Sequence, residues 1–267
     1  MQAPATTQAS TAPPAPAPAA PPAAGRRAIV VGASSGMGAA ICRQLAREGW
    51  RVAALARREG ALRSLAESAA EAPGEILPRV HDVGDAAAVP ALFEELVRAL
   101  GGLDLFVFAA GIMPEIGPAE YDTPVDLNML AINFGGCVAW TNPVAVLFRS
   151  QRRGTIVGIS SVAGERGRKG NPMYGSTKAA MNHYLESLRN RLGDFGVHVC
   201  TIKPGFVATA MTAGKDVFWL ITAEEAARQI LAAARGGANE RFVPRRWALV
   251  MFVIRHIPSF VFRKLNF

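Results

Sequence analysis

The sequence predicts an α/β protein built on a single doubly wound parallel sheet with helices on both faces. From residue 27 onward, short apolar or β-branched runs alternate with longer segments of helical period. The short runs are apolar at consecutive positions, as in strands that are buried on both faces. A chain of 267 residues, half of them apolar, allows one large α/β domain or two small ones, and the unbroken alternation favours one.

The alternation of apolar runs and helical segments predicts six strands and six helices. We expect strands at residues 28–31, 52–56, 76–81, 105–109, 155–159 and 197–202. We expect helices at residues 37–48, 61–70, 87–100, 125–150, 174–192 and 223–235. These elements make up a domain that we assign to residues 26–245.

The N-terminal segment and the cysteines indicate the compartment. Residues 1–25 are mostly Ala and Pro, with seven prolines and no charge, so we expect a disordered or polyproline-like tail. This segment lacks the charged start and unbroken apolar run of a signal peptide, and a cytoplasmic protein is therefore predicted. Cys42, Cys137 and Cys200 lie far apart with no CxxC motif, which indicates a reducing compartment and no metal site.

The positive charge is concentrated at the C-terminus. The net charge is +8, but residues 241–267 hold six cations and no acid, so 23 cations face 21 acids elsewhere. A nucleic-acid-binding protein would spread its cations over the main domain, and we expect no nucleic-acid partner. Residues 246–267 form an apolar-basic tail in which 247–254 is apolar all round a helix, yet shorter than the roughly 20 residues that span a bilayer. We expect 247–267 to contact a membrane surface, the alternatives being a dimer contact or a lid on the chain's own core.

A glycine-rich turn follows the first expected strand. Residues 32–38 are Gly-Ala-Ser-Ser-Gly-Met-Gly, and an apolar-periodic helix begins at once. Such glycines allow a tight turn and a close approach of the backbone to a pyrophosphate, which the helix N-terminus attracts. The strand–turn–helix context favours a dinucleotide site over an ordinary glycine loop.

The end of the second expected strand indicates which dinucleotide would bind. A dinucleotide site places there either an acid for a ribose hydroxyl or a cation for a 2′-phosphate, and this chain has Arg57 and Arg58. A guanidinium forms forked, charge-assisted hydrogen bonds with a phosphate, so the pair favours NADP(H) over NAD(H). The alternative is a solvated arginine pair at the start of a helix.

Tyr174 and Lys178 begin another expected helix. Their spacing of four residues places the phenol and the ammonium on one helical face. We expect the ammonium to lower the pKa of Tyr174, about 10 in model peptides, and so to make the phenol a useful general acid or base. Because the chain has 24 Arg and only five Lys, a lysine here indicates a need for a compact ammonium. The alternative is a chance pair on a solvated helix.

In these motifs, from residue 27 to about 244, the chain resembles the short-chain dehydrogenase/reductase family. The resemblance implies a Rossmann fold, a Ser-Tyr-Lys site and an NADPH-dependent enzyme that reduces a ketone or oxidises the corresponding alcohol. The implied catalytic residues are Ser161, Tyr174, Lys178 and Asn133. The implied cofactor contacts are Gly32, Ser34, Ser35, Gly36, Met37, Gly38, Arg57, Arg58, Asp82, Val83, Ala110, Gly111, Tyr174, Lys178, Pro204, Gly205, Val207 and Thr209.

The family mechanism implies a role for each catalytic residue. Tyr174 would protonate the carbonyl oxygen of the substrate while NADPH supplies a hydride to its carbon. Ser161 would hydrogen-bond that oxygen, and Lys178 would hold the nicotinamide ribose and tune Tyr174. Asn133 would support a water molecule through which protons are replaced.

Two positions depart from the family pattern. Val31 stands where the family usually has Thr, and Ala109 stands where it usually has Asn. Both missing side chains brace the cofactor loop by hydrogen bonds. A catalytically silent NADP-binding sensor is an alternative function, but the intact Ser161, Tyr174 and Lys178 argue against it.

Three regions bear on the substrate. The loop before Tyr174 carries the cations Arg166, Arg168 and Lys169, which serve either anion recognition or simple solvation. Residues 212–221 match the family's mobile substrate loop, and their apolar side chains suit an apolar partner. The C-terminal part is the third region.

The C-terminal part is similar to one branch of the family, the reductases of decaprenylphosphoryl-2-keto-pentose, which act on a sugar ketone carried by a polyprenyl phosphate. The similarity rests on residues 165–166, 205–207 and the apolar-basic ending. It implies a lipid-linked or otherwise hydrophobic ketone and a location at the inner face of the cell membrane. The alternative is a carbonyl reductase for free acyl, steroid or xenobiotic ketones. We also expect a homo-oligomer.

Overall fold

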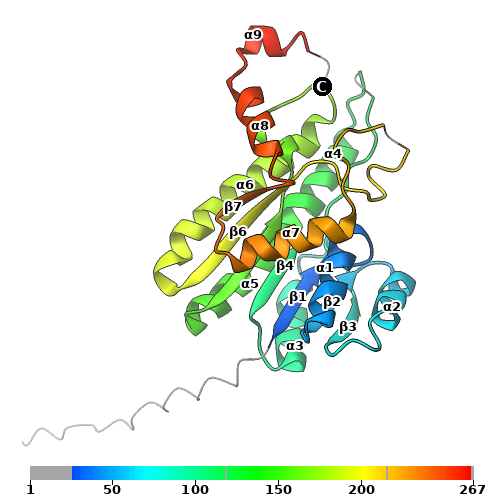
Figure 1. The fold of residues 1–267 in the computed structure, drawn as a ribbon, viewed down its shortest axis with the longest axis vertical. Helices are drawn as coiled ribbons and strands as arrows, with labels where there is room; N and C mark the ends of the chain where they lie inside the picture. Colours follow the sequence, from blue (N-terminus) through cyan, green and yellow to red (C-terminus); the bar gives the residue numbers. More distant parts are fainter. Residues whose placement is uncertain (1–25, 118, 215, 266–267) are drawn as a thin grey trace, which may run out of the picture.

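The fold is centred on a seven-stranded parallel sheet (Figure 1). The computed structural model describes residues 26–117, 119–214 and 216–265, so the tail expected at 1–25 lies outside the described residues. The strands are β1 (Arg27–Val31), β2 (Arg51–Ala56), β3 (Glu75–Val80), β4 (Leu105–Phe108), β5 (Gly154–Ile159), β6 (Val197–Pro204) and β7 (Glu240–Val243). Their order is β3-β2-β1-β4-β5-β6-β7, and all neighbours are parallel. The predicted doubly wound sheet is confirmed.

The strand β7 was not predicted from the sequence. Its four residues are Glu-Arg-Phe-Val, so no apolar run marks it. It forms the edge of the sheet, where it pairs with β6 from Thr201↔Glu240 to Pro204↔Val243. The other six strands agree with the expected ranges to within two residues at each end.

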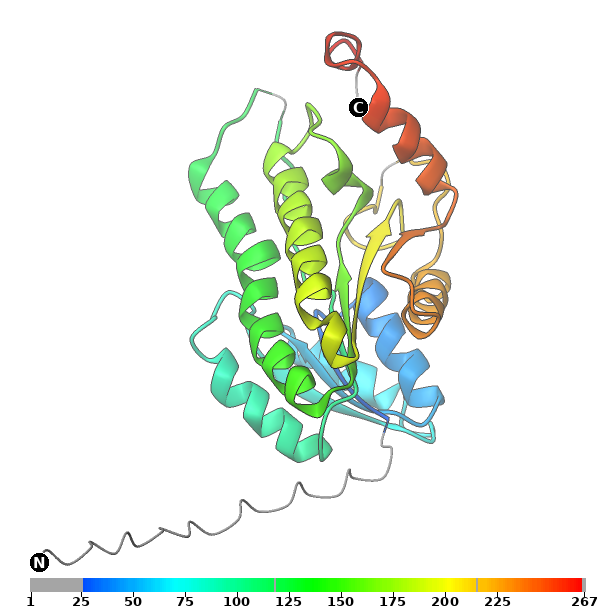
Figure 2. The ribbon, with the colours of Figure 1, turned by 90° about the vertical axis from the view of Figure 1, so that its left-hand side faces the viewer.

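Helices cover both faces of the sheet, as Figure 2 shows. One face is covered by α1 (Gly36–Arg47), α2 (Glu59–Glu67) and α7 (Ala223–Arg235). The other is covered by α3 (Val89–Leu100), α5 (Gly136–Gln151) and α6 (Pro172–Leu192). Each face buries its own apolar cluster, which explains why the strands are apolar at consecutive positions.

The long helix expected at 125–150 is divided into three segments. They are α4 (Thr123–Leu130), a π-helical turn η1 (Ala131–Gly135) and α5. Such π-helical turns occur often at functional sites, and this one carries the buried Asn133. By length and composition, Thr123–Gln151 could cross a bilayer. Its own side chains Trp140, Val144 and Phe148, however, are fully buried in the core of the domain. We therefore assign it to the fold as a core helix.

The C-terminal arm, residues 244–265, stands at one end of the molecule (Figure 1). It contains α8 (Trp247–His256) and α9 (Ser259–Phe262). Trp247 and Met251, one turn apart on α8, are buried, whereas Leu249 and Phe252 are exposed. The arm thus buries one face of α8 against the domain and presents another outward, which agrees with the lid expected as one alternative.

Candidate active site

Two adjoining hollows lie where strands of the sheet end. The first, called here the nucleotide cleft, has a volume of about 380 Å³ and follows β1, β2 and β4, at the point where the strand order reverses. The second, called here the apolar pocket, has a volume of about 330 Å³ and lies between the end of β6, the loop after β5 and the C-terminal arm. Met37, Thr209 and Met211 line both hollows.

The nucleotide cleft contains most of the predicted cofactor residues. Its walls include Gly32, Ser34, Ser35, Gly36, Met37, Gly38, Arg57, Arg58, Val83, Ala110, Gly111 and Thr209. Asp82 is exposed beside the cleft, and its carboxylate lies 3.9 Å from the Arg57 guanidinium. Pro204, Gly205 and Val207 line the apolar pocket instead.

The turn after β1 has the geometry of an anion-binding loop. Gly32 has φ +92°, and a Cβ there would overlap the backbone of Ala110, so only glycine allows β1 and β4 to approach so closely. The Gly32 and Ala33 amides both donate to the Leu55 carbonyl, at 2.8 and 2.9 Å. Backbone hydrogen bonds therefore brace this loop, although Val31 contributes no side-chain bond. The first turn of α1 contains no acid, so its N-terminus attracts anions.

Arg58 lies over this turn. Its Nη2 donates to Ser34 Oγ at 2.9 Å and to Ser35 Oγ at 2.7 Å, so its cation is held at the mouth of the nucleotide cleft. Arg57 also lines the cleft but lies near the carboxylate of Asp82. The two arginines thus have different partners, a distinction that their adjacent positions in the sequence do not reveal.

The predicted catalytic residues meet between the two hollows. Tyr174, in the first turn of α6, lines the apolar pocket together with Ser161, whose hydroxyl acts to lower the pKa of the phenol. Lys178 Nζ donates to the Ile159 carbonyl at 2.9 Å and lies 5.8 Å from the Tyr174 ring centre. A Cβ at Gly111 would lie 3.6 Å from this Nζ, so the buried Lys178 lies directly behind Gly111, a residue that lines the nucleotide cleft.

Asn133 is fixed beside this group. Its Oδ1 accepts from the Ile112 amide at 2.7 Å, and its Nδ2 donates to the Ile112 carbonyl at 2.9 Å. The same Nδ2 lies 3.3 Å from Thr177 Oγ1, on the turn between Tyr174 and Lys178. The π-helical turn η1 is thereby joined both to the end of β4 and to α6.

The titration of Tyr174 differs from the expectation. Burial raises its pKa above the usual value, while the hydrogen bond to Ser161 and the charge of Arg168 act in the opposite direction. Burial lowers the pKa of Lys178 from 10.5 to about 8. The expected lowering of the Tyr174 pKa by Lys178 is therefore wrong, because desolvation outweighs the neighbouring charges. Tyr174 is a protonated phenol at neutral pH.

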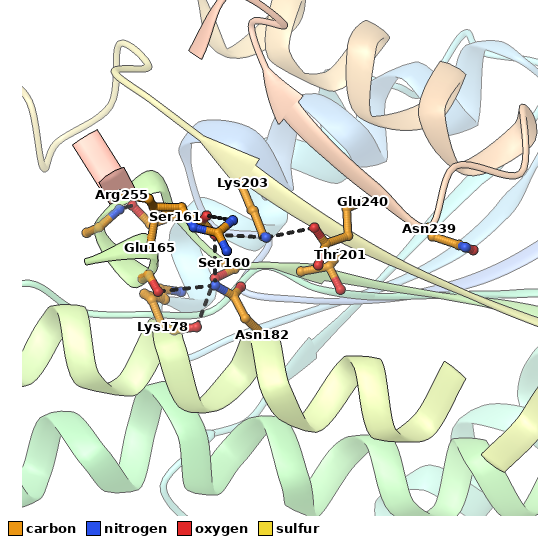
Figure 3. A network of polar contacts seen from close by, with 12 residues as sticks. Ser160, Ser161, Glu165, Lys178, Asn182, Thr201, Lys203, Asn239, Glu240 and Arg255 are labelled. Atoms are coloured by element: carbon orange, nitrogen blue, oxygen red, sulfur yellow. Dashed lines mark hydrogen bonds and ion pairs between the residues drawn. The ribbon is translucent and has the colours of Figure 1, made fainter. Parts of the chain in front are cut away.

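A buried ion-pair network holds the loop that carries Ser161 (Figure 3). This loop contains the short helix η2 (Val162–Glu165), and the Glu165 carboxylate is only 4% exposed. Lys203 Nζ, on β6, lies 2.8 Å from Glu165 and 2.8 Å from Glu240 on β7. Arg255 of the C-terminal arm reaches the same Glu165 at 3.2 Å. Glu165 therefore connects the Ser161 loop to the sheet and to the arm.

The C-terminal arm closes one side of the apolar pocket. Trp247, Val250, Met251 and Ile254 of α8 line it, together with Phe206 and Phe218. The ring centres of Phe206 and Phe218 lie 5.5 and 5.4 Å from that of Trp247. A Cβ at Gly205 would overlap the Trp247 indole, so the arm packs directly on the backbone at the end of β6.

Sequence reasoning missed Lys203 and the part played by Trp247 in the pocket. Lys203 is one of only five lysines, so the argument applied to Lys178 could also have singled it out. Trp247 was predicted as a membrane residue because an apolar helix does not reveal which of its faces is buried. Only the folded chain brings it to Gly205.

The comparisons with known proteins agree with this geometry. A family model described as short chain dehydrogenase matches residues 26–217. An uncharacterized oxidoreductase of Myxococcus xanthus (strain DK1622) is 34% identical over 85% of this chain and 92% of its own length. Another, from Mycobacterium tuberculosis (strain CDC 1551 / Oshkosh), is 33% identical over 89% of this chain and 96% of its own.

One similar protein of known structure was crystallised with NADPH. A variant of actinorhodin polyketide ketoreductase, crystallised with NADPH, superimposes with a TM-score of 0.74 and 26% identity. The match covers 82% of this chain and 95% of that chain. The comparisons do not confirm the decaprenylphosphoryl-2-keto-pentose reductase branch, which stays a prediction.

Proposed function

This chain belongs to the short-chain dehydrogenase family and is an oxidoreductase of that kind, and from this premise we propose that it is an NADPH-dependent ketone reductase. The observation that carries the proposal is the position of Tyr174. Its side chain and that of Ser161 both line the apolar pocket, and that pocket adjoins the nucleotide cleft. A phenol at this junction can reach a substrate bound beside a nicotinamide.

The residues of the nucleotide cleft support NADP(H) as the cofactor. The glycine turn and the N-terminus of α1 form a cradle for a pyrophosphate, with a glycine where any Cβ would collide. Arg58 offers a guanidinium at the cleft mouth for a 2′-phosphate, and Lys178, behind Gly111 of the cleft wall, would hold the nicotinamide ribose. When bound, the cofactor supplies the hydride.

Side chains of this protein supply the proton that the carbonyl oxygen of the substrate receives. The phenol of Tyr174, whose pKa burial raises above its ordinary value of about 10, is protonated at neutral pH and can donate a proton to a carbonyl oxygen as negative charge develops there. Ser161 can hydrogen-bond the same oxygen and stabilise that charge. Lys178, held by the Ile159 carbonyl, and Asn133, held by the backbone of Ile112, would support the replacement of the Tyr174 proton.

The composition of the apolar pocket supports a hydrophobic substrate. Its walls are mainly Met, Val, Ile and aromatic side chains, and its volume of about 330 Å³ suits the reacting end of a larger molecule. We therefore propose a lipid-linked or otherwise hydrophobic ketone. A sugar ketone linked to a lipid belongs to this class of substrate. Its reacting end would occupy the pocket, and the remainder of its lipid would lie outside.

The outer face of the arm supports a peripheral position at the cytoplasmic membrane. Exposed apolar side chains gather there and on the loop before α7, namely Phe218, Trp219, Leu220, Leu249, Phe252, Val253, Phe260 and Val261. Arginines accompany them, including Arg246, whose guanidinium lies 4.7 Å from the Trp219 ring centre, and Arg255. Apolar side chains rimmed by cations are typical of surfaces that bind anionic membranes.

The Tyr174→Phe variant tests the catalytic proposal. We expect NADPH oxidation with any accepted ketone to fall between about 10²- and 10⁴-fold, while NADPH affinity, measured by fluorescence titration, stays unchanged. Tyr184→Phe is the matched control on the same helix, because its hydroxyl binds Asn142, away from both hollows. Equal turnover of the Tyr174→Phe variant and the wild type would overturn the assignment.

Vesicle flotation tests the membrane proposal. The full chain is expected to float with phosphatidylglycerol-rich vesicles, less with phosphatidylcholine, and to dissociate as salt rises. The double variant Leu249→Ser, Phe252→Ser should lose flotation, whereas Val146→Ser, on the exposed side of α5, should retain it. Equal flotation of all three proteins would exclude the arm as the contact surface, and no flotation at all would favour a reductase of free ketones.

A further inference from the structure

The three cations of the loop before Tyr174 have different surroundings. Arg166 is occupied, because it donates to the Ile254 carbonyl and stacks 3.9 Å from the Phe262 ring centre. Lys169 lines a hollow beneath α9 and does not line the apolar pocket. Arg168 lines the apolar pocket beside Tyr174. Only one of the three is thus available to a molecule in that pocket.

Arg168 is half-buried, and among the described residues its guanidinium is unpaired. Within the part of the chain that the structure describes, no hydrogen bond or salt bridge engages this guanidinium. Of the same residues, no acid lines the apolar pocket, whereas Glu115 and Glu120 line a separate hollow that Arg168 also borders. Burial lowers its pKa, and its charge in turn lowers that of Tyr174, which indicates that the two side chains are close. A guanidinium withdrawn from water without an anion is costly, and such sites are typical of anion recognition.

We propose that Arg168 binds a negatively charged group, a carboxylate or a phosphate ester, that the substrate carries near its ketone. This inference rests on the proposed reductase function and narrows its substrate class to anionic amphiphiles. The charged group would pair with Arg168, and the hydrocarbon part would contact Phe206, Val250 and Met251. A neutral ketone of the same shape would bind but leave the guanidinium unpaired.

Paired substrates test the proposal directly. A medium-chain 3-oxo acid and its methyl ester share the ketone and the chain but differ in charge, and a keto-alkyl phosphate monoester distinguishes phosphate from carboxylate. We expect the wild type to prefer the better anion over the ester by at least about tenfold in kcat/KM. Arg168→Gln should remove most of that preference by lowering kcat/KM for the anion about 10- to 100-fold, with less than about threefold change for the ester.

A matched variant distinguishes an effect of the position of Arg168 from an effect of the net charge of the loop. Lys169→Gln removes the same charge from the neighbouring residue, outside the apolar pocket. It should lower the preference for the anion less than about threefold. Equal losses in the two variants would show that the loop acts only through its general field and would overturn the proposal. A shift of the pH profile with both substrates in Arg168→Gln, with no change in preference, would assign Arg168 to the tuning of Tyr174 and would also overturn it.

A binding measurement makes the test independent of turnover. Decanoate and decyl phosphate, which lack a ketone, are titrated calorimetrically into the NADP⁺-loaded protein. Arg168→Gln should weaken the better ligand by about tenfold or more and leave decanol binding unchanged. If no ketone is reduced but this difference is found, the reductase function fails while the anion site stands. If ketones are reduced but the wild type binds the anions no better than decanol, the anion site fails alone.

Discussion

The two hollows of the active site differ in how they are built. The nucleotide cleft is formed largely by a turn, a helix N-terminus and the ends of neighbouring strands, and the side chain of its principal cation, Arg58, is exposed. The apolar pocket is formed by segments far apart in the sequence. Two of its ties, Arg166 to Ile254 and Arg255 to Glu165, span 88 and 90 residues.

This difference in construction corresponds to a difference in role, because we assign cofactor binding to the nucleotide cleft and substrate specificity to the apolar pocket. The nucleotide cleft depends on backbone geometry around Gly32, which suits any dinucleotide-binding member of the family. The apolar pocket depends on side chains that the C-terminal arm and the loop after β5 bring together. Changes in the arm should therefore alter substrate binding without altering cofactor binding, and the reverse should hold for changes in the cleft.

The largest expected effect comes from Trp247→Ala. Removing a large buried side chain costs about 3–5 kcal/mol, and here that cost falls on the docking of α8 against Gly205. Hydrogen–deuterium exchange in α8 should accelerate by at least about 100-fold, and KM for hydrophobic ketones should rise. NADPH affinity should stay within a factor of about three.

Leu249→Ala is the control for this variant, because the Leu249 side chain lies on the same helix but is 71% exposed. Its effect on exchange should correspond to less than about 0.5 kcal/mol. If Trp247→Ala weakens the binding of NADPH as strongly as the binding of the ketone, the two hollows are not independent. The proposed separation of cofactor and substrate binding would then be wrong.

The contrast between the hollows also explains what the sequence could predict. The six principal strands and the glycine turn were predictable because local apolar runs and a contiguous motif mark them. The strand β7 was not, because its pairing with β6 is a tertiary effect on a half-polar segment. The raised pKa of Tyr174 also required the fold, since sequence spacing identifies the neighbouring charge but does not measure burial.

The next effect concerns Lys178, which lies between the hollows. The unfolded chain keeps the Lys178 proton up to about pH 10.5, whereas the folded protein releases it near pH 8. Between these values the unfolded state binds more protons, so the free energy of unfolding should rise with pH relative to the Lys178→Met variant. The full gain is about 3 kcal/mol across this window.

Urea unfolding of the cofactor-free wild type and Lys178→Met at several pH values from 7.5 to 10.5 measures this difference. The titrations of Tyr174, Cys42 and Cys200 are common to both proteins and largely cancel, whereas Cys137, whose pKa Lys178 lowers, belongs to the measured difference. A stability difference that stays constant over the window would mean that Lys178 keeps an ordinary pKa in the folded protein.

A smaller effect is expected at the mouth of the nucleotide cleft. Arg58→Ala removes a cation held by Ser34 and Ser35, and hydrogen bonds to a charged group contribute about 1.5–3 kcal/mol, so NADPH should bind about 10- to 100-fold more weakly. NADH, which has no 2′-phosphate, should be little affected. Arg57→Ala should have the smaller effect on NADPH, because its guanidinium lies near Asp82. Equal losses for both dinucleotides would contradict a 2′-phosphate role.

The smallest effect is expected for Arg255→Ala in the arm. Arg255 is 59% exposed, and a solvent-screened ion pair contributes less than about 1 kcal/mol. Glu165 keeps its buried partner Lys203 when Arg255 is removed, so the carboxylate is not left uncompensated. Exchange in α8 should therefore accelerate less than about fivefold, far below the effect of Trp247→Ala. If the two variants release the arm equally, its docking is governed by charge rather than by the packing of Trp247 on Gly205, and salt should then loosen the arm of the wild type as well.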